Sequence, residues 1–152
     1  MRTRTMLVLA IGITAIVAAC SGSSASSSPS AAASAAAGGG LTGKTWQLTA
    51  ITEKVPAFQG VVPAEDQANY TIEFNSDLSF NAKADCNQLA GTYATTGTDG
   101  LTLKPGPMTL VACPEGSLSS QYVEALGKSQ TYAIASGQLT ITLTDEGTLV
   151  FK

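Results

Sequence analysis

Three cysteines and eleven carboxylates are the side chains of this sequence best suited to chemistry, and histidine does not occur in it. Without histidine, the Ser-His-Asp and Cys-His mechanisms and His-ligated metals are excluded. A pair of acids at a suitable separation is all that glycoside chemistry formally needs. The candidates are Glu53, Glu65, Asp66, Asp85, Glu115 and Glu124. Any chain with eleven acids offers such pairs, so we expect no catalytic residue, no metal and no cofactor, and predict that the protein is not an enzyme.

The first cysteine, Cys20, stands at the end of a short apolar segment. Arg2 and Arg4 give the start of the chain positive charge, and the uncharged run of residues 6–19 follows. This is the layout of a signal peptide, and the run is shorter than the roughly 20 apolar residues that span a bilayer. Residues 17–20, Val-Ala-Ala-Cys, resemble the lipobox of bacterial lipoproteins, where lipid is attached to the cysteine thiol before cleavage on its N-terminal side.

These features predict a signal peptide over residues 1–19 and a lipid-bearing Cys20. The lipid would anchor the chain outside the cytoplasm, in the cell membrane or the outer membrane. A plain secretory signal with a cysteine at its end is the alternative. Residues 21–40 are Ser, Ala and Gly apart from Pro29. Such a segment buries too little apolar surface to offset its ordering entropy, so we expect a flexible tether over residues 20–40, with a short Ala-rich helix as the alternative.

The two remaining cysteines, Cys86 and Cys113, form a natural pair. If lipid occupies Cys20, they are the thiols left in a compartment that permits disulfides. We predict that they are bonded, and a loop of this length gives a stabilisation of roughly 3 to 4 kcal/mol in the chain-entropy model. A metal site or a reactive thiol are the other interpretations. Two cysteines without histidine do not build an ordinary zinc site.

The charge of the mature chain argues against nucleic acid as a partner. Once residues 1–19 are removed, six lysines face eleven acidic residues, a formal charge of −5. Nucleic acid and anionic membrane surfaces both reward clusters of Lys and Arg, and the sequence has no such cluster.

Apolar and polar residues alternate through most of residues 41–152, which predicts one mainly β domain built on an antiparallel sheet. The expected strands cover residues 45–50, 70–74, 78–82, 101–103, 108–112, 132–134, 139–143 and 149–151. Residues 118–126 have helical spacing instead and predict one short helix, with Ser117 as its N-cap and Gly127 just past its end. Residues 55–68 contain two prolines and have weak periodicity, so we expect a long loop there.

Several stretches of the domain resemble the META domain of the bacterial HslJ-like proteins. They include residues 41–46 with Trp46, the hairpin of residues 74–80, and the closing hairpin of residues 139–151. The core motif is Asp85, Cys86, Asn87, Gln88, Gly91, Thr92 and Tyr93, and the second cysteine motif is Met108, Thr109, Ala112, Cys113 and Pro114. Asp85 replaces the commoner glycine, although aspartate tolerates a left-handed backbone better than most residues.

The resemblance implies a compact antiparallel β-barrel-like fold and a place in the cell envelope. It supplies no established catalytic residue, and the family is associated with heat-shock expression and antibiotic tolerance. We therefore expect a tethered, non-catalytic protein with a binding or structural role in envelope maintenance or stress tolerance. A barrel that binds a small apolar ligand, a carboxylate-dependent hydrolase, and a scaffold for an envelope protein are the alternatives.

Two motif residues, Asn87 and Tyr93, have both a structural and a functional interpretation. We expect Asn87 to satisfy backbone groups of a turn beside the disulfide, and Tyr93 to pack with Trp46 in the core. Alternatively, their polar tips line a ligand cleft together with the loop of residues 55–68.

Overall fold

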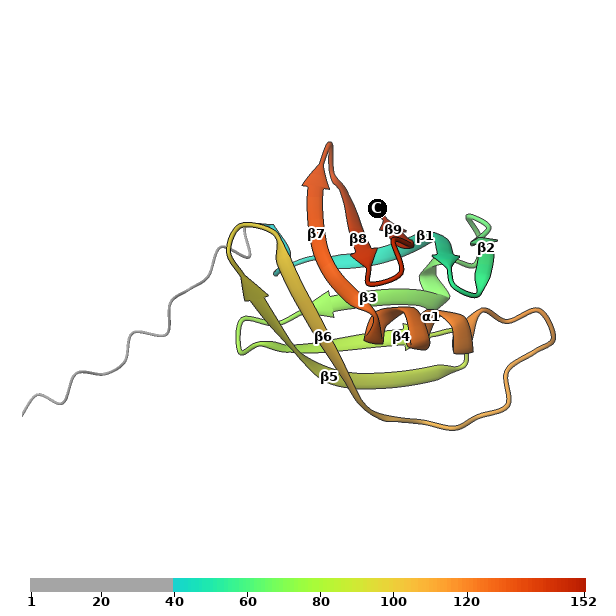
Figure 1. The fold of residues 1–152 in the computed structure, drawn as a ribbon. Helices are drawn as coiled ribbons and strands as arrows, with labels where there is room; N and C mark the ends of the chain where they lie inside the picture. The colour runs from blue at the N-terminus through green and yellow to red at the C-terminus, as the bar shows by residue number, and fades with distance from the viewer. Residues whose placement is uncertain (1–39) are drawn as a thin grey trace, which may run out of the picture. The chain divides into compact units, whose positions relative to one another are not determined.

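A computed structural model describes residues 40–152 of the chain (Figure 1), so the predicted signal peptide, the lipid on Cys20 and most of the tether lie outside the described residues. The described part is mainly β, as predicted. Its strands are β1 (Thr45–Lys54), β2 (Ala57–Val61), β3 (Tyr70–Phe74), β4 (Ser79–Ala84), β5 (Asn87–Thr96), β6 (Gly100–Met108), β7 (Ser129–Ala135), β8 (Gln138–Leu143) and β9 (Thr148–Phe151). The helices are the 3-10 turn η1 (Gln67–Asn69) and α1 (Ser119–Gly127).

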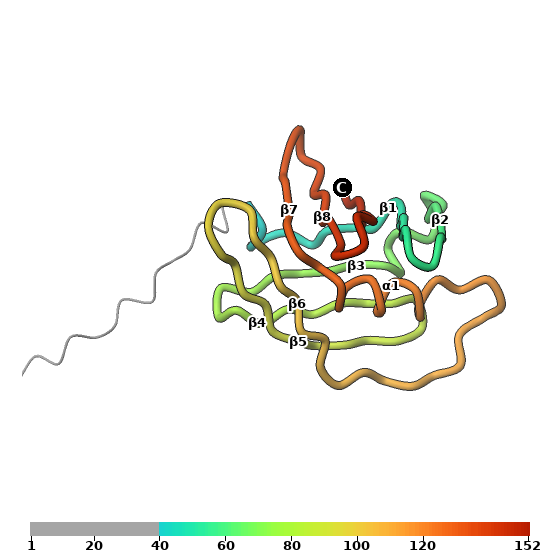
Figure 2. Tube along the Cα trace, in the orientation of Figure 1, coloured from blue at the N-terminus to red at the C-terminus, as the bar shows by residue number. Residues whose placement is uncertain are grey.

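The strands close into a barrel. They form one sheet in the order β2-β1-β3-β4-β5-β6-β7-β8-β9, and β9 pairs back onto β1. An eight-stranded antiparallel ring results, from which β2 is left as an appendage of β1. Figure 2 shows the chain path, with β3, β4 and β5 side by side and the connection from β6 to α1 swinging away from the body. The predicted β-barrel-like fold with one short helix is confirmed.

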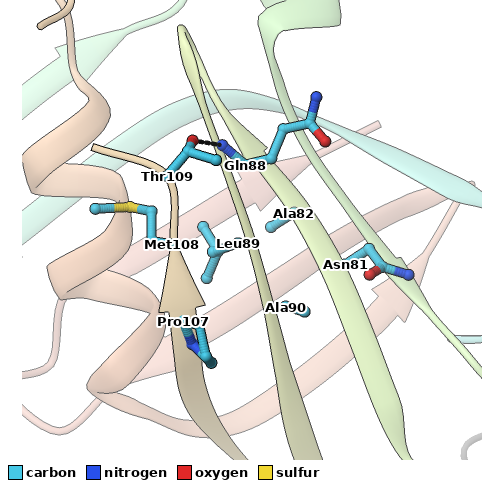
Figure 3. A pocket seen from close by; sticks show the side chains of 8 residues that line it. All are labelled: Asn81, Ala82, Gln88, Leu89, Ala90, Pro107, Met108 and Thr109. Carbon is cyan, nitrogen blue, oxygen red and sulfur yellow. Dashed lines mark hydrogen bonds between the residues drawn. The ribbon is translucent and has the colours of Figure 1, made fainter. Parts of the chain in front are cut away.

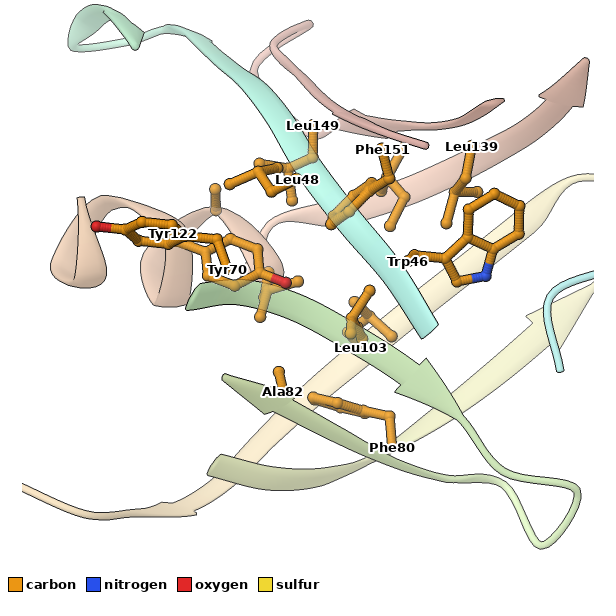
Figure 4. Packing of buried hydrophobic residues seen from close by; sticks show 14 of the residues in the cluster. Trp46, Leu48, Tyr70, Phe80, Ala82, Leu103, Tyr122, Leu139, Leu149 and Phe151 are labelled. Atoms are coloured by element: carbon orange, nitrogen blue, oxygen red, sulfur yellow. The ribbon is translucent and has the colours of Figure 1, made fainter. Parts of the chain in front are cut away.

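Alternation of side chains along the strands fills the ring. On β1, Trp46, Leu48 and Ile51 are buried, and the shift from even to odd positions falls at a bulge where β1 pairs with β9. An eight-stranded barrel has an interior just wide enough for side chains, and here large ones occupy it. Figure 4 shows Trp46, Phe80 and Phe151 directed into this shared interior. The largest fully buried side chains are Trp46, Tyr122, Phe74, Phe80, Phe151, Leu41, Leu48, Ile51, Ile72, Leu101, Leu126 and Leu139.

The helix lies where the sequence predicts it, but its ends differ. Helix α1 begins one residue later, and its N-cap position is Leu118, which has no side-chain cap bond. Ser117 nevertheless accepts a hydrogen bond from the Ser119 N–H at 3.2 Å. Gly127 belongs to the helix, and Lys128 takes the C-cap position with φ −95°. The last turn therefore ends without the left-handed residue that the glycine suggested.

Two sequence-based predictions were wrong: the long loop over residues 55–68 and the strand over residues 108–112. Residues 55–68 contain strand β2, which pairs with β1. Its side chains are exposed or half-buried, so the usual alternation of buried and polar positions is weak. Conversely, β6 ends at Met108, and residues 109–112 are not a strand. The side chain of Asn87 holds residues 109–112 in place, and a hydrogen bond from a distant side chain leaves no periodic pattern in the sequence.

Gly91 marks a close approach within the barrel wall. It lies opposite Phe80 in the β4–β5 register, and a Cβ at this position would meet the Phe80 ring and the Lys104 carbonyl oxygen, each at 2.5 Å. We predict that Gly91→Ala lowers the free energy of unfolding by about 1–3 kcal/mol, because backbone or ring must shift to admit the methyl group. Urea unfolding measures this. Thr92→Ala, at an exposed neighbouring position, serves as the control and is expected to stay within about 0.5 kcal/mol of the wild type; equal stability of the two variants would contradict the prediction.

Candidate binding surface

The predicted disulfide joins the start of β5 to the connection that follows β6. Cys86 and Cys113 are bonded, with Cα atoms 5.5 Å apart, which is an ordinary spacing for a disulfide. This confirms the pairing expected from the sequence. The bond fixes the far end of a segment that has already left the sheet at Met108.

Asn87, next to the disulfide, bonds that segment with its side-chain amide. Its Nδ2 donates to the carbonyl oxygen of Val111 at 3.0 Å, and its Oδ1 accepts from the Val111 N–H at 2.8 Å. The amide thus presents to Val111 one donor and one acceptor, as a neighbouring strand does in a ladder. The same Nδ2 lies 3.3 Å from each sulfur of the disulfide.

Thr109 completes the attachment. Its hydroxyl donates to Asn87 Oδ1 at 3.1 Å and accepts from the Gln88 N–H at 3.0 Å. Its own N–H donates to the Gln88 carbonyl oxygen at 3.0 Å. Residues 109–113 are therefore held at Thr109, at Val111 and at Cys113, and we call them the clamped segment.

The clamped segment carries apolar side chains into solvent. Leu110 is 88% exposed and Val111 is 59% exposed. Both belong to a segment whose backbone is bonded to the barrel, so the two side chains stay at the surface instead of folding back against the core. The sequence did not predict this exposure, because an alternating strand over residues 108–112 would place Leu110 on its apolar face.

A shallow cavity of about 490 Å³ lies beside the clamped segment, over β4, β5 and the end of β6 (Figure 3). Thr109 belongs both to its lining and to the clamped segment. The lining is mostly small or apolar, with two amide side chains, and consists of Asn81, Ala82, Gln88, Leu89, Ala90, Pro107, Met108 and Thr109. Apolar walls with a few polar groups are the usual composition of a ligand pocket.

The other motif residues lie in the framework of the fold. Trp46 is buried, and its indole N–H donates to the Leu41 carbonyl oxygen at 3.0 Å, which secures the start of the domain. Asp85 adopts the left-handed conformation with φ 59°, at the turn between β4 and β5. Tyr93 is buried, and the ring against which it packs edge-on is Phe74, at 5.1 Å between centroids.

The structure does not bring Asn87, Tyr93 and residues 55–68 together into one cleft. Asn87 and Tyr93 occupy different places along β5, and the Tyr93 hydroxyl donates to the carbonyl oxygen of Asn75 at 2.8 Å. Burial raises the pKa of this phenol above its ordinary value, with the nearby Asp77 adding to the effect. Neither residue, and no part of residues 55–68, lines the cavity.

Two of the candidate acids meet at a lysine. Lys128 Nζ lies 2.8 Å from Glu53 Oε1 and 2.9 Å from Glu124 Oε1. The Glu53 side chain is only 4% exposed, whereas that of Glu124 is 62% exposed. The hydrogen bond to Glu53, followed by that to Glu124, raises the pKa of Lys128 above its ordinary value. A cation between the two carboxylates is the arrangement of a structural ion pair.

Asp145 lies near this ion pair and binds backbone groups. Its Oδ2 accepts from the N–H groups of Lys54 and Val55, and its Oδ1 accepts from that of Gly147. Desolvation opposes ionisation, but these three bonds and the charge of Lys128 outweigh it and hold the pKa of Asp145 below its ordinary value. The side chain thus joins the β8–β9 turn to the β1–β2 turn. Within residues 40–152, no three Cys, Asp or Glu side chains are grouped to hold a metal ion, and no helix has the length and apolar character needed to cross a bilayer.

Comparison with known proteins identifies the domain. A family model for the META domain matches residues 39–152, so the chain belongs to the META domain family. The NMR structure of a protein from Burkholderia xenovorans is 23% identical, with a TM-score of 0.57 over 74% of this chain and 82% of that chain. The crystal structure of a DUF4847 family protein from Bacteroides vulgatus is 16% identical, with a TM-score of 0.52 over 73% of this chain and 92% of that chain. At such identities these structures show a shared fold, and no curated protein matches the chain.

The role of Asn87 is open to direct measurement. We predict that Asn87→Leu lowers the free energy of unfolding by about 1–3 kcal/mol, because the hydrogen bonds to Val111 and Thr109 are lost. Hydrogen exchange of the Val111 amide is expected to accelerate well beyond what the global loss of stability explains. The control is Asn81→Leu, an exposed residue of β4, for which exchange at Val111 should not change. Unaltered protection of Val111 in the Asn87 variant would show that the disulfide and the bonds between Thr109 and Gln88 hold the segment without the Asn87 amide.

Removal of the cation between Glu53 and Glu124 tests the ion pair. Lys128→Met is expected to destabilise the fold more than Glu124→Gln does, because Glu53 is buried and is left without its partner. The folded-state pKa of Lys128 is raised, so its contribution is complete below the ordinary lysine pKa of about 10.4 and is lost as the pH rises through the raised value. Urea unfolding of the wild type and of Lys128→Met should therefore give a difference in unfolding free energy that is constant from neutral pH to about pH 10. Above about pH 10 this difference should shrink. A difference that grows above pH 10 would contradict this account; tyrosine ionisation is common to both proteins and cancels.

Proposed function

We propose that this protein is a lipoprotein anchored through Cys20 outside the cytoplasm, and that its META domain serves envelope maintenance or stress tolerance by binding an envelope component. The binding surface is the clamped segment with the cavity beside it. On this proposal the domain has no catalytic role, and residues 20–40 act as the tether that lets the barrel reach its partner.

The observation that carries the proposal is the exposure of Leu110 and Val111 on a backbone that is held in place. Single exposed apolar residues are ordinary, but here two adjacent ones follow Thr109, which lines a cavity with mostly small or apolar walls. A backbone that is already held in one arrangement loses less conformational entropy when a partner binds it. A disulfide and the amide of Asn87 supply that preorganisation.

Binding on the outer surface is favoured over the two alternatives. A small apolar ligand inside the barrel would have to displace large buried side chains such as Trp46 and Phe151. A carboxylate-dependent hydrolase would need two acids free to donate and accept protons, whereas two of the six candidate acids, Glu53 and Glu124, share a lysine. The partner is an envelope protein or a small apolar molecule that fits the cavity, and nucleic acid is disfavoured by the charge of −5 on the mature chain.

Site-specific photo-crosslinking in intact cells tests the proposal. A photoreactive residue at position 110 of the full chain is expected to capture a partner, and one at Thr98, in the exposed β5–β6 turn, is not. Val111→Ser together with the probe should reduce capture at least about tenfold, because the lost apolar contact is worth about 1.5–3 kcal/mol. Mass spectrometry of the adduct separates a protein from a small molecule.

Two results would contradict the proposal. Equal capture from positions 110 and 98 would mean that the clamped segment has no partner of its own. The anchor is tested separately with Cys20→Ser, which is expected to release the protein from the membrane fraction. If this variant stays in the membrane fraction, Cys20 is not the site of attachment.

A further inference from the structure

Strand β2 has an unpaired edge. Every other strand of the described residues has a neighbour on each side, since β9 returns to β1, whereas β2 pairs with β1 alone. Natural proteins protect such edges with charged side chains, because free N–H and C=O groups are a template for another strand. The sequence of β2, Ala-Phe-Gln-Gly-Val, contains no charge.

The hydrogen bonding of the β1–β2 hairpin shows which backbone groups face outward. The Val62 N–H donates to the Thr49 carbonyl oxygen at 2.9 Å, and the register continues without a bulge to the turn. Because bonded positions alternate in an antiparallel pair, Gly60 and Phe58 direct their backbone groups toward β1. The backbone groups of Gln59 and Val61 point away from β1, to the free edge.

The side chains of this edge are also open. Ala57, Gln59 and Val61 share one face of β2 and are exposed, with Val61 71% exposed. Val55, in the turn that precedes the strand, is 72% exposed. Neutral and apolar side chains thus flank free backbone groups, although the mature chain as a whole carries a charge of −5.

We infer that β2 pairs antiparallel with β2 of a second copy of this chain, about a two-fold axis at Gln59, and joins two barrels through a continuous sheet. In this register Gln59 faces Gln59 of the second copy, and Val61 faces its Ala57. Gln59 and Val61 have outward backbone groups, and Ala57 lies at the end of the strand. The same residues therefore pair from both copies, and the interface is self-complementary, as a two-fold dimer requires.

Charge favours a second copy as the occupant. The paired strands bring no like charges together, because β2 has none. Antiparallel pairing also places the β1–β2 turn of one copy, with Lys54, near the end of β2 of the other copy, which is followed by Glu65 and Asp66. All three side chains are exposed. The two-fold axis repeats this approach of opposite charges at the other end of the interface. The inference is independent of the clamped segment, which is attached to β5 and not to β2.

Cross-linking at the axis tests this arrangement in the full chain. In a hydrogen-bonded antiparallel pair the Cα atoms lie about 5.5 Å apart, within the range that a disulfide spans. Gln59→Cys produced in intact cells and oxidised is expected to give a covalent dimer on a non-reducing gel. Thr98→Cys, equally exposed but remote from the axis, should remain monomeric. Dimers from both variants in equal yield would reflect collision and overturn the inference, as would a Gln59 adduct with a different chain and no dimer.

Charged substitutions at Gln59 give an independent measurement of the dimer. The purified full chain in detergent is expected to sediment with twice the protein mass, and Gln59→Lys and Gln59→Glu each as monomers, because like charges then face each other. Mixing the two variants should restore the dimer. Gln59→Pro removes only an outward N–H, so it should leave the fold intact by circular dichroism and abolish the dimer. A wild-type chain that is monomeric at every concentration, or a dimer that survives Gln59→Pro, overturns the inference.

Discussion

The pairing of β9 with β1 closes the sheet, and the rest of the molecule depends on that closure. β1 is the strand on which it rests: one edge bonds β3 and then β2, and the other bonds β9. The Gln47 and Lys152 backbones exchange two hydrogen bonds, at 3.0 and 2.9 Å, at the end of this seam. Without the seam, both faces of a long twisted sheet would need cover. With it, the large side chains of every strand share one interior.

A ring of eight strands leaves little room inside for anything except its own side chains, so chemistry and recognition fall to the outside. Two features of the exterior are not explained by packing. One is the clamped segment, where a disulfide and the amide of Asn87 hold exposed Leu110 and Val111 beside a cavity. The other is β2, which hairpin formation adds to β1 outside the ring and which therefore keeps a free edge. The free edge of β2 follows from the closure, whereas the clamped segment follows from the disulfide and the Asn87 amide.

The sequence predicted what local patterns control. Period-2 alternation placed most strands, helical spacing placed α1, and cysteine arithmetic paired Cys86 with Cys113. It missed β2, because a strand outside the ring buries little and so shows little alternation, and it placed no strand over β5. It also placed a strand over residues 108–112, since the apolar spacing there resembles a strand, whereas the segment after Met108 is held by a side-chain amide. The exposure of Leu110 and Val111 depends on Asn87, more than twenty residues earlier, a contact that no local pattern encodes.

Native-state hydrogen exchange of the β1 and β9 amides tests the closed barrel most directly. If the seam is integral to the fold, these amides exchange only when the whole domain unfolds, and their exchange free energies equal the unfolding free energy from urea and match those of β4 and β5. Exchange of β9 through a local opening several kcal/mol below global unfolding would contradict a closed ring. It would mean that the sheet is open at β1, with β9 as a second free edge.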